Sequence, residues 1–250
     1  METKTKQISR RAFLAGLGVT GAALGLSACC PMGSLDHKTK AIDLVHGNDP
    51  SLFPVYDGKE YTKKDFSRLT QDTNLGLSPE MINNHLGLYA KYVDKVNQSE
   101  AEMRAGEITE LGMKNLAFSL NGMALHDIYF SNMNSSKSKA SKALSKAINE
   151  SYGSFDSYYR NLTNIATQVK GWSITAVNLL NGKLINYGTE DHSANFPNFV
   201  MPILALDVYE HAYVIDFGDD GKNSYLDSFT AIIDWDLVSR RYDAMMLQYS

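Results

Sequence analysis

Apolar residues recur at helical spacing along two long stretches in the first half of the chain. The first stretch opens at Ser78 and Pro79, and serine as N-cap with proline at the first helical position is typical of a helix start. The second stretch covers residues 108–132. Since residues three or four apart share one face of a helix, both stretches predict long amphipathic helices. The residues on these faces are Met81, Ile82, His85, Tyr89, Tyr92, Val93 and Val96 in the first helix, and Leu111, Leu116, Leu120 and Met123 in the second.

The pattern changes in the second half of the chain, after a polar linker that begins at Asn134. From Trp172 onward, β-branched and apolar residues follow one another as in a strand, and Asn181-Gly182 predicts a hairpin turn. The expected elements are helices at 140–150 and 154–170, strands at 172–180, 183–187 and 201–207, and mostly helix from Tyr209 to the end.

These elements predict an α+β fold. A long N-terminal helical hairpin is expected beside a C-terminal lobe with a small three-stranded antiparallel sheet flanked by helices. We expect four parts along the chain: a signal peptide at 1–28, a tether and irregular arm at 29–60, an N-terminal helical-hairpin domain at 61–134, and a C-terminal α/β domain at 135–250.

The first part has the layout of an export signal. Ser9-Arg10-Arg11-Ala12-Phe13-Leu14 resembles the twin-arginine signal, and a mildly apolar stretch over residues 15–28 follows it. That stretch is shorter than the roughly 20 apolar residues that a membrane-spanning helix needs. We therefore expect the protein to be exported.

The export signal ends at a cysteine. Leu26-Ser27-Ala28-Cys29 resembles the lipobox of bacterial lipoproteins, in which the cysteine becomes the lipidated first residue. Cys29 would then hold the protein on a membrane surface, on the periplasmic or cell-surface side. The alternative is a plain signal peptide with a coincidental cysteine. Cys29 and Cys30 are the only cysteines, so we expect no disulfide within the folded domain.

The composition is that of an ordinary globular protein. Hydrophobic residues make up 44% and charged residues 21% of the 250 residues. The formal net charge is −4, and it becomes −7 when the four basic residues and one acidic residue of the signal peptide are removed. A nucleic-acid-binding protein usually carries a basic face, so we expect no nucleic-acid partner.

The sequence contains six histidines, and only their pattern can identify metal ligands, because a single histidine on a helix is more often a satisfied core or surface residue. The pattern is strongest at Asp207 and His211. There an apolar strand ends at the carboxylate Asp207, and the imidazole of His211 follows four residues later, on the same side of a helical turn. Carboxylate and imidazole ligands without cysteine favour iron or manganese over a zinc ribbon or an iron–sulfur cluster.

Several segments, over roughly residues 70–243, resemble the iron/manganese superoxide dismutase family. Asp207-Val-Tyr-Glu-His-Ala-Tyr is similar to the family's Asp-x-Trp-Glu-His-Ala-x-Tyr region, and further similar segments lie at 77–85, 92–97, 126–130, 171–172 and 191–197. The resemblance implies superoxide as the substrate and one iron or manganese ion per chain. It assigns the metal ligands to His85, His126, Asp207 and His211, with a solvent molecule as fifth ligand.

The resemblance also implies roles for residues around these ligands. His192 holds the loop position from which some members direct a glutamine to the metal-bound solvent, while the alternative position on the second helix is Gly122. Glu210 is expected to reach the ligand histidine of a partner subunit, which implies a homodimer. Trp172 and Tyr209 are expected to surround the ligands.

The first ligand helix departs from the family pattern. The family places an entrance tyrosine eight residues after the first ligand, but here Val93 holds that position. Tyr92 is favoured as the entrance tyrosine over Tyr89, and core packing is the alternative for both. Tyr89 also replaces a second family histidine, four residues after His85.

Two functions follow from these expectations. The first is a superoxide dismutase that works outside the cytoplasm. The second is a non-enzymatic metal-binding or structural lipoprotein with the same fold, which the altered tyrosine spacing favours. A zinc hydrolase on the same residues is weaker, because such sites usually have three protein ligands and an open position.

Overall fold

The computed structural model describes residues 51–247, so the expectations for the signal peptide, Cys29 and most of the tether lie outside the described residues. The described part confirms the predicted α+β class. Its elements in chain order are α2 (Arg68–Gln71), α3 (Pro79–Ala105), α4 (Glu110–Ser131), α5 (Lys142–Tyr152), α6 (Phe155–Gln168), β1 (Trp172–Asn178), β2 (Leu184–Thr189), β3 (Val200–Asp207), η1 (Glu210–Ala212), α7 (Val214–Phe217), α8 (Lys222–Ala231) and α9 (Trp235–Met246).

Helices α3 and α4 form the predicted long hairpin, and both begin with a side-chain cap. The Ser78 hydroxyl accepts a hydrogen bond from the backbone N–H of Met81, and the Thr109 hydroxyl accepts one from Gly112. Such caps satisfy backbone donors that have no partner inside the helix. Gly106 ends α3 in the left-handed conformation, with φ 75°, which turns the chain back toward α4. Helix α3 thus begins at the predicted residue and extends nine residues past Val96, and α4 begins and ends within two residues of the predicted range 108–132.

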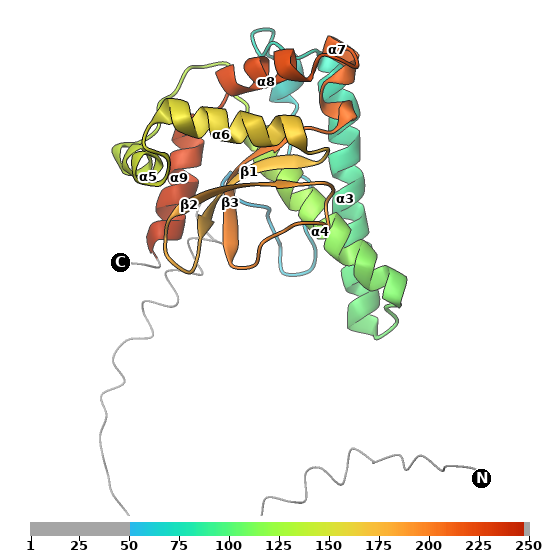
Figure 1. Ribbon diagram of the computed structural model, residues 1–250. Coiled ribbons are helices and arrows are strands. Elements are labelled where there is room, and N and C mark those ends of the chain that lie inside the picture. The colour runs from blue at the N-terminus through green and yellow to red at the C-terminus, as the bar shows by residue number, and fades with distance from the viewer. Residues whose placement is uncertain (1–50, 248–250) are drawn as a thin grey trace, which may run out of the picture. The chain divides into compact units, whose positions relative to one another are not determined.

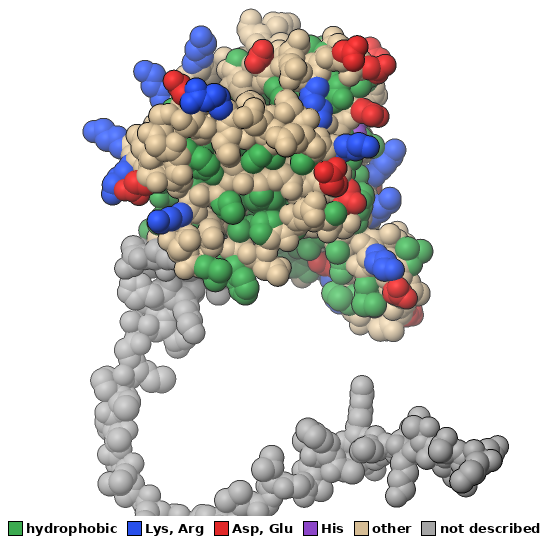
Figure 2. All heavy atoms as spheres, in the orientation of Figure 1, with side chains coloured by type: hydrophobic (Ala, Val, Ile, Leu, Met, Phe, Trp, Pro, Cys, Tyr) green, Lys and Arg blue, Asp and Glu red, His purple; other side chains and the backbone are tan. Residues whose placement is uncertain are grey.

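The far end of this hairpin extends beyond the rest of the described fold (Figures 1 and 2). Met103, Leu111 and Met113 are exposed there. Leu111, which belongs to the predicted apolar stripe of the second helix, is not covered by another described element, and 66% of this residue is accessible to solvent. The apolar stripe becomes fully buried only farther along α4, where Met123 reaches the core.

The predicted sheet is present, with strand order β2-β1-β3 and antiparallel pairing throughout. Gly182, with φ 70°, forms the turn between β1 and β2. The first residue of β1, Trp172, pairs with the last residue of β3, Asp207. Helix α6 covers the sheet on one side, while α4 packs against β3 (Figure 1). Because helices cover the central strand, β1 is buried along nearly its whole length.

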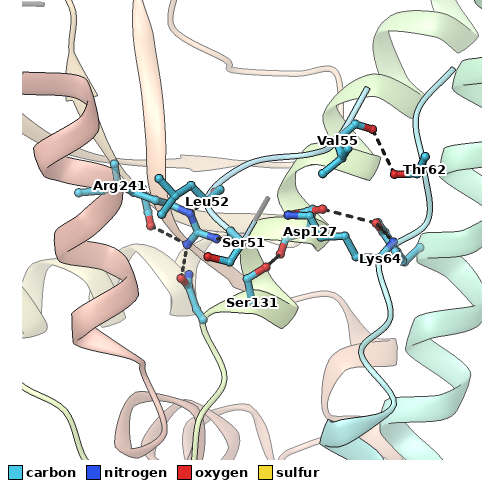
Figure 3. A network of polar contacts seen from close by, with 11 residues as sticks. Ser51, Leu52, Val55, Thr62, Lys64, Asp127, Ser131 and Arg241 are labelled. Atoms are coloured by element: carbon cyan, nitrogen blue, oxygen red, sulfur yellow. Dashed lines mark hydrogen bonds and ion pairs between the residues drawn. The ribbon is translucent and has the colours of Figure 1, made fainter. Parts of the chain in front are cut away.

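A buried arginine ties the N-terminal arm to this core. The Arg241 guanidinium, from α9, donates a hydrogen bond to the backbone oxygen of Leu52 (Figure 3). It also donates to the side chain of Asn132 and to the backbone oxygen of Ile203. These partners satisfy a charge that would be costly to bury alone. The arm therefore has a fixed place beside α4 and β3. Among the described helices, none combines the length and apolar character needed to cross a bilayer.

Candidate metal centre

Four side chains with metal-binding atoms meet in the core. They come from different elements: His85 from α3, His126 from α4, Asp207 from the end of β3, and His211 from η1. One ligand atom from each lies within 4.8 Å of all the others. The distances from Asp207 Oδ2 to the histidine Nε2 atoms are 3.1 Å for His85, 3.3 Å for His211 and 3.6 Å for His126. The four residues predicted as ligands are thus brought together around one carboxylate oxygen.

The backbone after β3 fixes the orientation of this carboxylate. The backbone N–H of Tyr209 donates to Asp207 Oδ1 at 2.9 Å, which leaves Oδ2 to face the histidines. The Tyr225 hydroxyl donates to the backbone oxygen of Asp207 at 2.7 Å and fixes the strand end from the other side. His211 follows one short helical turn later. Sequence reasoning missed Tyr225, since its contact depends on how α8 folds back onto β3.

The ring of His126 is held in the tautomer that a metal ligand needs. Its Nδ1 lies 2.6 Å from the backbone oxygen of Gly122. A carbonyl can only accept a hydrogen bond, so Nδ1 carries the proton and Nε2 keeps a free lone pair. That Nε2 is buried and has no hydrogen-bond partner among the described residues. A buried lone pair that faces a carboxylate and two other imidazoles fits a bound metal ion.

The charges at the centre also suit a cation. Burial alone would raise the pKa of Asp207, but His211 and His85 hold it well below its usual value. Burial lowers the pKa of His85 and of His126, so both rings are neutral at physiological pH. Burial lowers the pKa of His211, but the neighbouring Asp207 carboxylate raises it overall, so a metal ion at the centre would take the place of a proton on that ring. Metal binding requires deprotonated ligands of this kind, and the cluster can hold a metal ion.

His192 lies beside the four residues, in the space next to Gly122. Its ring centroid is 5.6 Å from that of His126 and 4.8 Å from that of Tyr92. The residue is only 1% exposed, and neither ring nitrogen has a hydrogen-bond partner among the described residues. A Cβ atom on Gly122 would lie 3.2 Å from His192 Nδ1. His192 therefore occupies the space that a side chain at position 122 would fill.

Two aromatic residues complete the wall around the ligands. The Trp172 ring lies 5.0 Å from that of His126, at an interplanar angle of 82°. Tyr209 stacks on His211, with 5.2 Å between the ring centroids and an angle of 15°. The His211 side chain is 30% exposed, and the neighbouring Glu210 is exposed. The centre is thus closed on the Trp172 side and reaches solvent on the His211 side.

The two candidate entrance tyrosines point to different places. Tyr92 is half-buried and packs against His126 and His192. The Tyr89 hydroxyl instead lies 3.4 Å from the carboxylate of Asp127 and accepts a hydrogen bond from the backbone N–H of Lys64. Only Tyr92 therefore borders the centre with its ring beside His192. Asp127 was missed by sequence reasoning, although a charged residue within an apolar helix segment is a signal for a buried partner.

Comparisons with known proteins identify the family. Residues 140–241 match the family described as iron/manganese superoxide dismutases, C-terminal domain. The chain is 30% identical to the superoxide dismutase [Fe] of Aquifex pyrophilus over 189 residues, which cover 70% of this chain and 88% of that protein. It is 31% identical to the superoxide dismutase [Mn] of Mycolicibacterium smegmatis over 169 residues, which cover 64% of this chain and 81% of that protein. The chain therefore belongs to the iron/manganese superoxide dismutase family.

Proposed function

We propose that this protein is a superoxide dismutase that converts two superoxide anions and two protons to oxygen and hydrogen peroxide. The observation that carries the proposal is the convergence of His85, His126 and His211 on a single oxygen of Asp207. These four residues would hold one iron or manganese ion. When bound, such an ion supplies one-electron redox chemistry between its divalent and trivalent states.

The residues of the chain set the charge and the access of this centre. Asp207 provides the only carboxylate of the cluster, and the buried imidazoles of His85 and His126 provide neutral donors. The cluster is fully buried except at His211, whose side chain is 30% exposed. A small anion would therefore approach from the His211 side. Its attraction to the centre would come from the cation held there, because the chain as a whole is acidic.

His192 and Tyr92 are the candidates for handling protons. Burial lowers the pKa of His192 to about 4, so at neutral pH the ring holds one proton on one of its nitrogens. Burial and the charge of Asp207 raise the pKa of Tyr92, so its hydroxyl stays protonated. Both groups would donate a hydrogen bond to a solvent molecule at the centre. Through that solvent molecule they would supply protons to the reaction.

A homodimer and a place on a membrane belong to the same proposal. The exposure of Glu210 next to the partly exposed ligand candidate His211 supports a partner subunit that covers this side. The twin-arginine-like segment and Cys29 support export and lipid anchoring on the periplasmic or cell-surface side. Since a protein of this kind must fold around its metal, export in the folded state suits it.

The alternative is a metal-binding lipoprotein with this fold and without useful dismutation. The orientation of Tyr89 favours it. This residue replaces a family histidine, and its hydroxyl is turned toward Asp127 and Lys64 instead of the centre. A changed surrounding of this kind alters the potential and proton supply of a redox metal.

One paired measurement separates these functions. Metal content is determined by elemental analysis on the purified chain, and superoxide consumption is followed on the same sample. The proposal predicts about one iron or manganese ion per chain together with fast dismutation. Metal at full occupancy without dismutation would favour the metal-binding lipoprotein, and a chain that takes up neither metal would remove the enzyme and leave only a structural lipoprotein.

A further inference from the structure

The two helices that supply the buried histidines are also joined by a group of polar residues next to those histidines. Asp127 follows His126 directly in α4, and Tyr89 lies one helical turn after His85 in α3. Asp127 is fully buried and Tyr89 is 3% exposed. The contact between Tyr89 and Asp127 therefore crosses from helix to helix at the level of the metal centre.

A third residue closes this group into a ring. Lys64, in the N-terminal arm, donates from Nζ to Asp127 Oδ1 at 2.7 Å, as Figure 3 shows. Its backbone N–H donates to the Tyr89 hydroxyl at 3.2 Å, and that hydroxyl faces Asp127 Oδ2 at 3.4 Å. Lys64, Tyr89 and Asp127 thus connect the arm, α3 and α4 through one closed set of hydrogen bonds.

Stability alone is a poor reason for this arrangement. The side chains of Lys64 and Asp127 are only 13% and 1% exposed, and taking both charges out of water costs much of what their attraction provides. What a buried, fully paired charge does supply is geometry, because a displaced helix would leave a carboxylate without its partner. The neighbouring pair of Lys63 and Asp94 has no such effect, since both side chains are well exposed.

We propose that Lys64, Tyr89 and Asp127 are positioning residues that set the separation of His85 and His126 and so tune metal binding. This inference rests on the proposed function, because it concerns the same metal centre. Neither Lys64 nor Asp127 contributes an atom to the ligand cluster. Their effect passes through the backbone of α4, in which Asp127 adjoins His126, and through the turn of α3 that joins Tyr89 to His85.

The test uses the full chain and a matched pair of double variants. Lys64→Met with Asp127→Asn removes the buried ion pair without leaving an unpaired charge. Lys63→Met with Asp94→Asn makes the same chemical change at the exposed pair. Manganese(II) affinity is measured by competition with a chelator, the manganese(II) electron paramagnetic resonance spectrum is recorded at full occupancy, and the melting temperature is measured on the metal-free chain.

We expect the buried double variant to bind manganese about tenfold more weakly or worse, with a changed resonance spectrum, because supporting residues around a metal typically matter by 10–100-fold. The exposed double variant should match the wild-type chain in affinity and spectrum. A lower melting temperature with unchanged affinity and spectrum would mean a purely structural role and would overturn the inference. A wild-type chain that binds no manganese or iron would overturn the metal centre itself.

Tyr89→Phe keeps the test decisive if the buried double variant does not fold. This change removes one hydroxyl and leaves the ion pair and the ring packing in place. We expect the manganese affinity to fall several-fold. We also expect the resonance spectrum of the loaded protein to change in the same way as in the buried double variant. Wild-type affinity and an unchanged spectrum in Tyr89→Phe would show that the ring of contacts does not position the histidines.

Discussion

The imidazole of His192 lies where a side chain on residue 122 would have to go. A Cβ atom on Gly122 would approach His192 Nδ1 to 3.2 Å and the Tyr92 ring to 3.0 Å. The side chain of Asn121, the residue before Gly122 in α4, donates a hydrogen bond to the backbone oxygen of His192 at 2.7 Å. This bond holds the His192 loop against α4. The imidazole of His192 therefore fits at this place because residue 122 is a glycine.

Gly122→Ala should disturb this arrangement while the fold survives. Alanine favours the helix by about 1 kcal/mol, whereas overpacking costs roughly 1–3 kcal/mol, so we expect a net destabilisation of about 1 kcal/mol. Displacement of His192 and Tyr92 should lower superoxide turnover by about tenfold. Urea unfolding and a turnover assay at equal metal content check both parts. Gly87→Ala is the control: it lies on the exposed face of α3 with open space around it, so it should leave turnover unchanged.

His192 also makes the stability of the metal-free chain depend on pH. Its pKa falls from 6.5 to about 4 on burial, so between these values the unfolded chain binds more protons than the folded chain. Stability is therefore lost as the pH falls from about 6.5 to 4, by up to about 3 kcal/mol for this residue. Urea unfolding of the metal-free protein at pH 7 and pH 4.5 measures the loss. It should be smaller in His192→Gln, and an equal loss in both proteins would contradict the assignment.

Asp207→Ala should remove most of the bound metal, because it deletes the carboxylate on which three imidazoles converge. We expect metal content to fall at least about tenfold and dismutation to fall with it. Elemental analysis after dialysis against a mild chelator is the measurement. Asp227→Ala, at an exposed position of α8, should keep its metal. Full occupancy in Asp207→Ala would show that Asp207 is not a ligand.

Tyr92→Phe should slow the reaction without loss of metal. The ring would still pack against His126 and His192, but the hydroxyl that can donate to solvent at the centre would be gone. Turnover should fall by about tenfold while the metal content stays constant. Tyr159→Phe is a suitable control, since Tyr159 is half-buried in α6 and contacts Trp235 edge to face, with 5.8 Å between the ring centroids. Equal turnover in Tyr92→Phe and wild type would remove Tyr92 from the mechanism.

Export and anchoring are tested in cells by two changes at the N-terminus. Replacement of Arg10 and Arg11 by lysine should keep the protein in the cytoplasm. Cys29→Ser should permit export but release the protein from the membrane fraction. Fractionation followed by immunoblotting distinguishes these outcomes. Normal export of the lysine variant would remove the twin-arginine route, and membrane retention of Cys29→Ser would remove the lipid anchor.

Local sequence signals predicted most of the elements, because their causes are local. Ser78 and Pro79 predicted the start of α3, and Asn181-Gly182 predicted the β1–β2 turn. The exposure of Leu111 was not predictable in this way, since it depends on how far the hairpin extends beyond the other elements. A helical period shows that one face is apolar but not how much of that face another element covers.

At the candidate centre, too, some features could be predicted from the sequence and others could not. The four candidate ligands could be proposed from residue type, spacing and family resemblance. The ring of Lys64, Tyr89 and Asp127 could not, because it joins positions 63 and 38 residues apart in the sequence. The same holds for Arg241, whose partner at Leu52 is 189 residues away. Such pairings follow only from the assembled fold.

The distance along the chain between His85 and Asp207 governs when the cluster can form. The two residues lie 3.1 Å apart in space but 122 positions apart in sequence. Asp207 is the last residue of β3 and pairs with Trp172, the first residue of β1. A growing polypeptide on the ribosome therefore lacks the complete cluster until residue 211 has been synthesised. An ion held by all four side chains would therefore bind only to a chain that extends past His211 and in which α3, α4 and β3 have come together.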